Sequence, residues 1–134
     1  MDRVLLDTNV ILDLLSFDRP GHAEAQAFLE RALDEKGLEV VIAASSLNDA
    51  YHILRRHHSS EEWARDDIAT LRRLFTVAEL TFEVVDRALA SDEPDFEDGI
   101  IRATAELVGA RAIVSNDRAA FRTSPVPRRS PAEA

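Results

Sequence analysis

The chain has 134 residues, 25 acidic against 16 basic side chains, a net charge of −9 at pH 7 and no cysteine. This length predicts one domain over residues 1–134, and 46% hydrophobic with 31% charged residues is typical of a folded globule, which excludes wholesale disorder. The absence of cysteine excludes disulfides and thiolate metal sites and favours a reducing, cytoplasmic location. The longest apolar run, Val40–Ala44, is far shorter than the roughly 20 residues of a membrane span, so no membrane partner is expected.

The basic side chains are fifteen arginines and a single lysine, Lys36. The net negative charge argues against a nucleic-acid binder that works through a broadly basic surface. A local arginine patch could still contact RNA, because a guanidinium group binds phosphate through two parallel hydrogen bonds. The excess of arginine over lysine also fits a plain codon preference, so composition leaves the partner open.

The first half of the chain alternates short apolar runs with amphipathic segments. The pattern predicts a strand, a short helix, a longer helix, a second strand and a helix capped by a serine: Arg3–Leu6, Val10–Leu15, His22–Lys36, Leu38–Ala43 and a helix that Ser45 or Ser46 begins. Asp7, Thr8 or Asn9 could cap the short helix. The longer helix is expected to bury a stripe that includes Phe28 and Leu33 and to end at Gly37.

The second half continues the alternation. It predicts a helix from Ser59 or Ser60 to about Phe75. After this helix it predicts a weak strand (Thr76–Leu80), two helices (Thr81–Ala90 and Phe96–Val108) and a short apolar strand (Ala112–Val114). Gly109 should end the Phe96 helix. Trp63, Phe75 and Phe82 are assigned to the core. The proline-rich tail, residues 123–134, is expected to be at most an edge strand with a loose end.

Strands that alternate with helices at this spacing predict a mostly parallel central sheet covered by helices on both faces, a three-layer α/β/α fold. In such sheets the groups that carry chemistry gather at the carboxyl ends of the strands. Asp7 and Asp117 each follow a predicted strand, Asp98 lies in the first turn of the Phe96 helix, and Asp49 lies one turn into the helix after the second strand. All four can therefore converge on one side of the molecule.

Carboxylates brought close together raise each other's pKa, and a hard divalent cation relieves their repulsion. Carboxylate and water oxygens are the ligands that Mg²⁺ and Mn²⁺ prefer, and such ions promote phosphodiester hydrolysis. Each acid also has an ordinary structural role open to it: a helix cap for Asp7, a favourable helix-dipole position for Asp98, a turn for Asp117 and a solvated helix face for Asp49. Only their joint placement favours a metal site.

The segment Asp7-Thr8-Asn9-Val10-Ile11-Leu12-Asp13 resembles the opening of PIN domains, the ribonuclease fold of VapC-type toxins. The resemblance continues through four further motifs, in order and at matching spacing: Asp18-Arg19-Pro20, Asp95-Phe96-Glu97-Asp98, Ile113-Val114-Ser115-Asn116-Asp117, and Phe121 with the Ser124-Pro125-Val126-Pro127 tail. It spans essentially the whole chain and is greatest to a bacterial subgroup of toxin components.

The resemblance implies roles for individual residues. The family's first acid falls on Asp7, with Asn9 as its polar support, and the later acids fall on Asp98 and Asp117, with Ser115 as the accompanying hydroxyl. The second acid, usually Glu, falls on Asp49, or on Asn48 if the register shifts by one residue. These residues would hold Mg²⁺ or Mn²⁺ as catalytic metal ligands in an RNA-cleaving toxin.

The resemblance further implies an RNA substrate, a cognate antitoxin protein and a homodimer as partners. Two departures favour a second hypothesis, a catalytically weak or inactive PIN-like protein that acts by binding RNA or a partner: Asp49 is shorter than Glu, and Ala120 stands where the subgroup has Asp. Haloacid-dehalogenase-like and response-regulator-like domains also use a strand-end Asp. A haloacid-dehalogenase-like domain would need a second Asp at position 9, where this chain has Asn9. A response-regulator-like domain would need a lysine at the end of a late strand, whereas the only lysine of this chain is Lys36.

Overall fold

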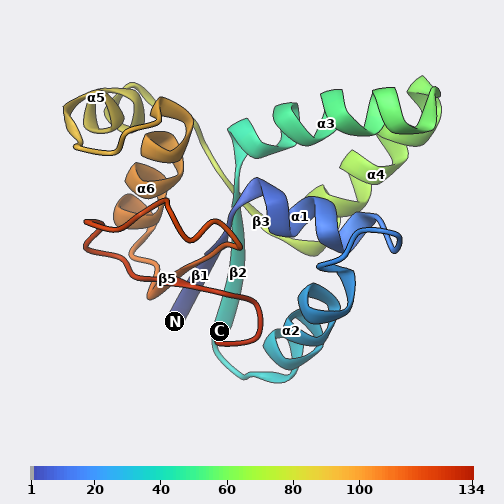
Figure 1. Cartoon of the computed structure of the whole chain (residues 1–134), viewed down its shortest axis with the longest axis horizontal. Coiled ribbons are helices and arrows are strands. Elements are labelled where there is room, and N and C mark those ends of the chain that lie inside the picture. The colour runs from blue at the N-terminus through green and yellow to red at the C-terminus, as the bar shows by residue number, and fades with distance from the viewer. Residues whose placement is uncertain (1) are drawn as a thin grey trace.

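The structure is a computed structural model that describes residues 2–134 (Figure 1). In chain order its elements are β1 (Asp2–Leu6), α1 (Thr8–Leu15), α2 (His22–Asp34), β2 (Leu38–Ala43), α3 (Ala44–His58), α4 (Glu61–Leu74), β3 (Thr76–Ala78), α5 (Phe82–Ala90), α6 (Phe96–Val108), β4 (Ala112–Val114) and β5 (Arg128–Arg129). The alternation predicted from the sequence is confirmed, and the bounds of β2, α6 and β4 agree residue for residue.

The five strands form one sheet in the order β3-β2-β1-β4-β5, and every neighbouring pair is parallel. β1 lies in the middle, so Leu5 pairs with Val41 of β2 on one side and with Ile113 of β4 on the other. Strands buried on both faces need apolar side chains on both faces, which is why these strands have nearly continuous apolar sequences. All carboxyl ends lie at one edge of the sheet.

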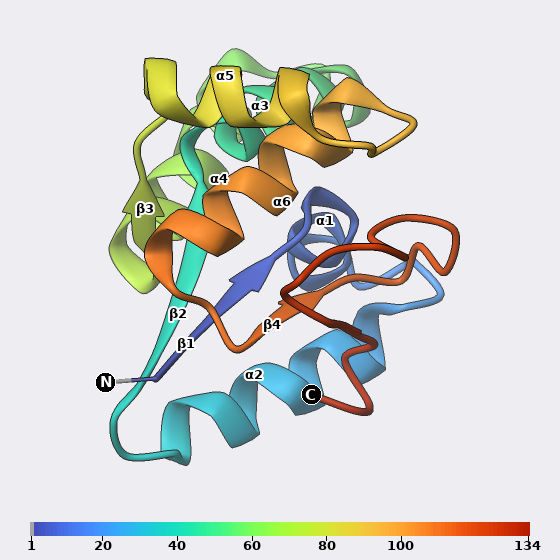
Figure 2. The same cartoon turned by 90° about the vertical axis from the view of Figure 1, so that its left-hand side faces the viewer.

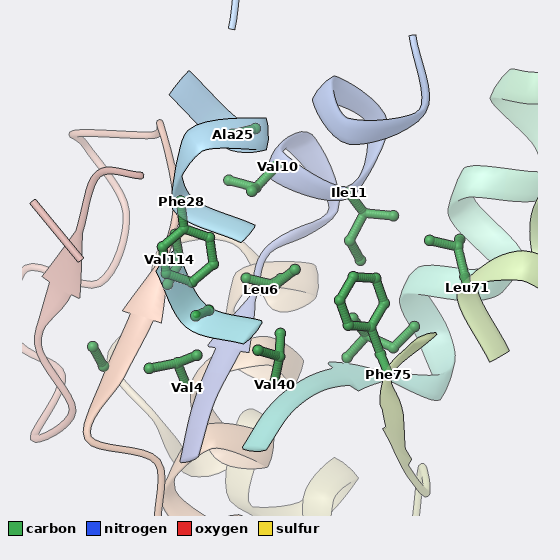
Figure 3. Close-up of a cluster of buried hydrophobic side chains, with 13 residues drawn as sticks. Val4, Leu6, Val10, Ile11, Ala25, Phe28, Val40, Leu71, Phe75 and Val114 are labelled. Atoms are coloured by element: carbon green, nitrogen blue, oxygen red, sulfur yellow. The ribbon is translucent and has the colours of Figure 1, made fainter. Parts of the chain in front are cut away.

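Helices cover both faces, which confirms the three-layer α/β/α arrangement (Figure 2). Figure 3 shows the larger core cluster, in which Val4 and Leu6 of β1 pack with Val10 of α1, Phe28 of α2 and Phe75 after α4. On the opposite face Leu5, Val41 and Ile113 pack against α6 and the segment after β4. α5 packs on α6 as an outer element. Among residues 2–134 no helix combines the length and apolar character needed to span a bilayer.

Of the six helices in residues 2–134, four begin with a side-chain cap, whereas α2 and α3 do not. The predicted end of α2 at Gly37 is wrong, because the helix ends at Asp34. Asp7, Ser60, Thr81 and Asp95 cap α1, α4, α5 and α6 through side-chain oxygens that accept backbone N–H groups. Gly109 ends α6 in the left-handed conformation, as predicted. The predicted serine cap of α3 is wrong: the helix already begins at Ala44, with no side-chain cap.

Ser46, one of the two expected caps, is fully buried inside α3 instead. Its hydroxyl accepts a hydrogen bond of 2.9 Å from the Oγ1 atom of Thr8 in α1. A tertiary contact between α1 and α3 therefore replaces the local capping bond that the serine could have made.

Three side chains predicted to lie in the core are exposed. Phe82 is 92% exposed, Leu33 is 62% exposed, and Trp63 is 59% exposed. In α4 the inward positions are taken by Ala64 and Leu71, so Trp63 turns outward and packs on the ring of His58. Phe75 is buried as predicted.

The C-terminal tail is better ordered than its prolines predict. β5 forms the edge strand beside β4, but the expected loose end is wrong, because Val126 and Pro131 are buried. The guanidinium of Arg31 in α2 donates a hydrogen bond of 2.8 Å to the carbonyl of Pro131. The tail therefore closes the sheet edge and is held against α2.

Candidate active site

A cleft of about 400 Å³ at the carboxyl edge of the sheet is lined by residues of α3, α5 and α6. Figure 1 shows α3 on one side of the sheet edge and α5 and α6 on the other. The four predicted acids line it: Asp7 after β1, Asp49 from α3, Asp98 from α6 and Asp117 after β4. Four segments far apart in sequence thus bring carboxylates to one hollow, because the strands that precede them are parallel and end at the same edge.

Asp7 is the most rigidly held of the four. Its carboxylate is buried and accepts three hydrogen bonds: from the backbone N–H of Thr8 at 2.8 Å, from the Ser115 hydroxyl at 2.7 Å and from the Asn9 side-chain amide at 3.3 Å. Burial raises the pKa of Asp7 above its ordinary value and the charge of Asp117 adds to the rise, whereas the bonds from Ser115 and Thr8 lower it.

Ser115 and Asn9 link the ends of β1 and β4. The buried Ser115 hydroxyl donates to Asp7 and accepts from the side-chain amide of Asn9 at 3.3 Å and from the backbone N–H of Asp117 at 3.1 Å. The side-chain oxygen of Asn9 accepts from the backbone N–H of Asn116 at 3.2 Å. Both residues therefore hold the backbone that carries Asp117.

Asp98 lies one turn into α6, where the side chain of Asp95 accepts its backbone N–H at 3.1 Å. Burial raises the pKa of Asp98 to about 7, with further contributions from the charges of Asp7, Asp95, Asp117 and Glu93. Asp98 therefore exchanges its proton near neutral pH. The proximity of the acids is thus expressed in the electrostatics of Asp98.

The phase of α3 places the two alternatives, Asp49 and Asn48, differently. Successive residues of a helix point about 100° apart, so the two side chains lie on different faces. Asp49 lines the acidic cleft, whereas Asn48 lines a separate hollow between α3 and α4, next to Tyr51 and Glu61.

None of the four acids forms an ion pair with an arginine, lysine or histidine of residues 2–134. Within the same residues no three carboxylate or imidazole side chains stand close enough to form a ready-made metal cage. The donor set is nevertheless of the oxygen type that Mg²⁺ prefers, and Mg²⁺ is usually held by one or two carboxylates with water as its remaining ligands. The cleft fits such an ion.

Apolar side chains complete the lining of the cleft. They include Ile53 of α3, Leu80 before α5, Val85 of α5 and Phe96 at the start of α6. A larger hollow of about 670 Å³ lies between α2, β2 and the end of α4, but Glu39 is its only acid and is ion-paired with Arg3 at 2.6 Å. The carboxyl-edge cleft is therefore the better candidate for metal-dependent chemistry.

Sequence reasoning missed the buried carboxylate of Asp13. It accepts hydrogen bonds from Arg19 at 2.7 Å and from the side chain of Asn116 at 2.9 Å, so it ties α1 and the following loop to the residue before Asp117. A Cβ atom on Gly21 would lie 2.2 Å from an Asp13 carboxylate oxygen, so glycine leaves room for this carboxylate. The missed signal was an acid inside the otherwise apolar run of α1.

A parallel α/β/α fold with carboxylates from several segments in one carboxyl-edge cleft defines the class of this protein. Residues 3–119 match the sequence model of the PIN domain. The chain belongs to the PIN domain family, and the resemblance that begins at Asp7-Thr8-Asn9 is confirmed. A comparison with curated proteins found no significant match.

Solved structures show the same fold. VapBC2 of Rickettsia felis, bound to a DNA fragment from its promoter, superposes with a TM-score of 0.72 at 12% identity, covering 96% of this chain and 98% of that chain. VapBC-1 of nontypeable Haemophilus influenzae gives 0.71 at 15% identity, covering 98% and 99%. VapC20 of Mycobacterium tuberculosis, a toxin that cleaves the sarcin–ricin loop, gives 0.69 at 18% identity, covering 85% and 89%.

Proposed function

We propose that this PIN domain is a Mg²⁺- or Mn²⁺-dependent endoribonuclease that hydrolyses RNA phosphodiesters as the toxin of a type II toxin–antitoxin pair. The observation that carries the proposal is the cleft in which Asp7, Asp49, Asp98 and Asp117 meet without a basic partner in residues 2–134. Four carboxylates without cations form a site that attracts a divalent ion and repels the RNA backbone until the ion is bound.

Each residue then has a stated role. Asp7 presents a carboxylate that three hydrogen bonds hold in one orientation, and Asp98 and Asp117 complete the acidic side of the cleft. Asp49 approaches from α3. A divalent ion bound here would activate a water molecule for attack and offset the charge that develops on the phosphodiester. Ser115 preserves the geometry by holding Asp7 and the backbone of Asp117 together.

The partners follow from the same proposal. An RNA substrate is supported by the fold shared with VapC20, which cleaves the sarcin–ricin loop, and an antitoxin by the toxin–antitoxin complexes that share the fold. An enzyme that acts on cellular RNA would work in the cytoplasm.

A catalytically weak or inactive PIN domain that acts by binding RNA or a partner is the second candidate. Two observations favour it: residues 2–134 hold no ready-made group of three metal ligands, and position 120, where the subgroup that the chain resembles has Asp, is a buried alanine. The two candidates differ in whether bound metal leads to RNA cleavage.

Calorimetric titration with Mn²⁺, together with an RNA cleavage assay, tests the proposal. We expect saturable Mn²⁺ binding that strengthens from pH 6 to pH 8, because Asp98, whose pKa is about 7, must lose its proton to bind the ion. Cleavage should stop when EDTA removes the metal and return when Mn²⁺ is restored in excess. Metal binding without cleavage of any RNA in a structured panel would favour the binding protein, and cleavage that resists EDTA would exclude the metal-dependent enzyme.

A homodimer is the remaining proposed partner, and α5 supplies its interface. Phe82 and Leu89 are spaced i and i+7 on α5 and are 92% and 68% exposed, so α5 presents an apolar stripe away from α6. Exposed apolar stripes of this kind mark protein contacts, and a two-fold contact between copies would bury the same stripe twice.

Phe82→Asp should therefore convert the dimer to a monomer. Aspartate at the first position of a helix is favourable, so α5 should remain folded. Light scattering coupled to size-exclusion chromatography measures the mass. Phe17→Asp is the matched control, since Phe17 is 86% exposed in the loop between α1 and α2, and it should leave the dimer unchanged. Equal masses for wild type and Phe82→Asp would contradict the proposed interface.

A further inference from the structure

Glu93 and Arg102 form a nearly buried ion pair behind the acidic cleft. The Glu93 Oε1 atom lies 3.3 Å from Arg102 Nη1, and the two side chains are 2% and 11% exposed. The other carboxylate oxygen of Glu93 accepts the backbone N–H of Phe121 at 3.2 Å. Glu93 is thus fixed from two sides, by the arginine of α6 and by the loop that follows Asp117.

The position of Arg102 in α6 makes this pairing unexpected. Arg102 is four residues after Asp98, the spacing at which an acid and a following base attract each other on a helix surface. The guanidinium instead donates to Asp92, in the segment before α6, at 2.7 Å. It also donates to the backbone carbonyl of Thr123, in the segment after β4, at 3.3 Å. Asp98 makes no ion pair with any residue of 2–134.

Of the acids around Arg102, Glu93 is the most buried, although Asp92 makes the shorter contact with the same nitrogen. The Asp92 side chain is 66% exposed, so water weakens its attraction for Arg102. Glu106 approaches only to 3.7 Å, from the other end of the helix. A buried carboxylate in a low-dielectric surrounding attracts a cation more strongly than an exposed one. The charge of Glu93 is therefore the one beside Arg102 that water screens least.

We infer that Glu93 is a positioning residue that holds Arg102 away from Asp98 and so keeps this carboxylate available to a divalent cation. The inference rests on the proposed function, because it assigns to the cleft the metal proposed above. Without the Glu93 charge, Arg102 would turn to the carboxylate one helical turn before it. The arginine would then compete with the metal for Asp98.

Mn²⁺ titration of three variants tests the inference. Glu93→Gln keeps an oxygen that can accept the Phe121 N–H but loses the charge, and we expect its Mn²⁺ affinity to fall about 10-fold, as for other residues that support metal ligands. The double variant Glu93→Gln/Arg102→Met removes the competing cation and should bind Mn²⁺ within about threefold of wild type, a recovery that corresponds to most of that 10-fold loss. Glu106→Gln, which removes a different partner of Arg102, should leave the affinity unchanged.

Recovery in the double variant is the decisive result, because a merely structural pair would make the double variant as poor as the single one or poorer. Thermal unfolding of every variant establishes that it is folded during the titration. Unchanged Mn²⁺ affinity in Glu93→Gln, or no recovery in the double variant, would overturn the positioning role alone. A wild-type chain that binds no Mn²⁺ would instead overturn the proposed metal site, and the inference with it.

Discussion

The Asp7→Asn variant should lose about a thousandfold of its metal-dependent RNA cleavage, or roughly 4 kcal/mol of transition-state stabilisation, while it folds like the wild-type chain. Asp7 is the acid with the most hydrogen bonds in the cleft, and the amide that replaces it carries no charge to hold a divalent ion. Initial rates with a cleaved RNA at saturating Mn²⁺ measure the loss.

The fold should survive because asparagine can take over the structural work of Asp7. Asparagine is as good a helix cap as aspartate, so its side-chain oxygen can still accept the Thr8 N–H at the start of α1. The new amide loses the hydrogen bond with Ser115 if its nitrogen faces this hydroxyl, which already accepts from Asn9 and from the Asp117 N–H. Burial raises the pKa of Asp7, so folding works against its charged form, and a neutral side chain offsets the lost bond at pH 7. We therefore expect the variant to unfold at about the wild-type temperature.

Asp18→Asn is the matched control for Asp7→Asn. Asp18 is an exposed acid in the loop between α1 and α2, so the variant makes the same change of net charge outside the cleft. It should cleave RNA at the wild-type rate. Undiminished cleavage by Asp7→Asn would show that hydrolysis takes place elsewhere or needs no metal at this carboxylate.

Gly21→Ala and Asp13→Ala should each destabilise the protein and should not be additive. Loss of Asp13 leaves Arg19 and Asn116 without their acceptor, and we expect it to lower the free energy of unfolding by about 3 kcal/mol. A methyl group on Gly21 would collide with the Asp13 carboxylate, at an expected cost of about 2 kcal/mol.

In the double variant the methyl group enters the space that the carboxylate leaves. We therefore expect a total loss at least 1 kcal/mol smaller than the sum of the two single losses, about the coupling found between residues in contact. Urea unfolding of the four chains gives each free energy, and Asp18→Ala, in the exposed part of the same loop, should change it by less than about 0.5 kcal/mol. Strict additivity would mean that Gly21 and Asp13 do not contact in solution.

The strands and most helix ends were predictable because their causes are local. A strand buried on both faces is apolar over its buried length, and residues 40–43 and Ala112–Val114 show this in sequence alone. The caps at Asp7 and Gly109 likewise depend on side-chain chemistry and backbone freedom at one position. The placement of Asp7, Asp98 and Asp117 in one cleft then follows from parallel topology.

The orientation of helices about their own axes was not predictable, because apolar spacing shows which residues share a face but not which face meets the sheet. Phe82 and Leu89 share a stripe of α5, and that stripe points away from α6, where Val84 and Ala88 make the contact. The same uncertainty left Asp49 and Asn48 as alternatives. Their separation required the phase of α3 relative to the sheet.

The supporting residues were unpredictable for a different reason. Asp13 bonds to Asn116, 103 residues later, and Glu93 meets Phe121, 28 residues later. Such long-range pairs leave no periodic pattern in the sequence. In the sequence alone, Asp13 and Glu93 cannot be told from ordinary surface acids. Only the burial of both carboxylates in the folded chain distinguishes them.

The central position of β1 has a consequence for synthesis on the ribosome. Within the domain β1 is translated before its neighbour β4, and the hydrogen bond from Ser115 to Asp7 closes a separation of 108 residues. A nascent chain therefore cannot assemble the cleft until the ribosome has passed β4. Any activity that depends on the four acids together is thus withheld from the ribosome while most of the domain is being made.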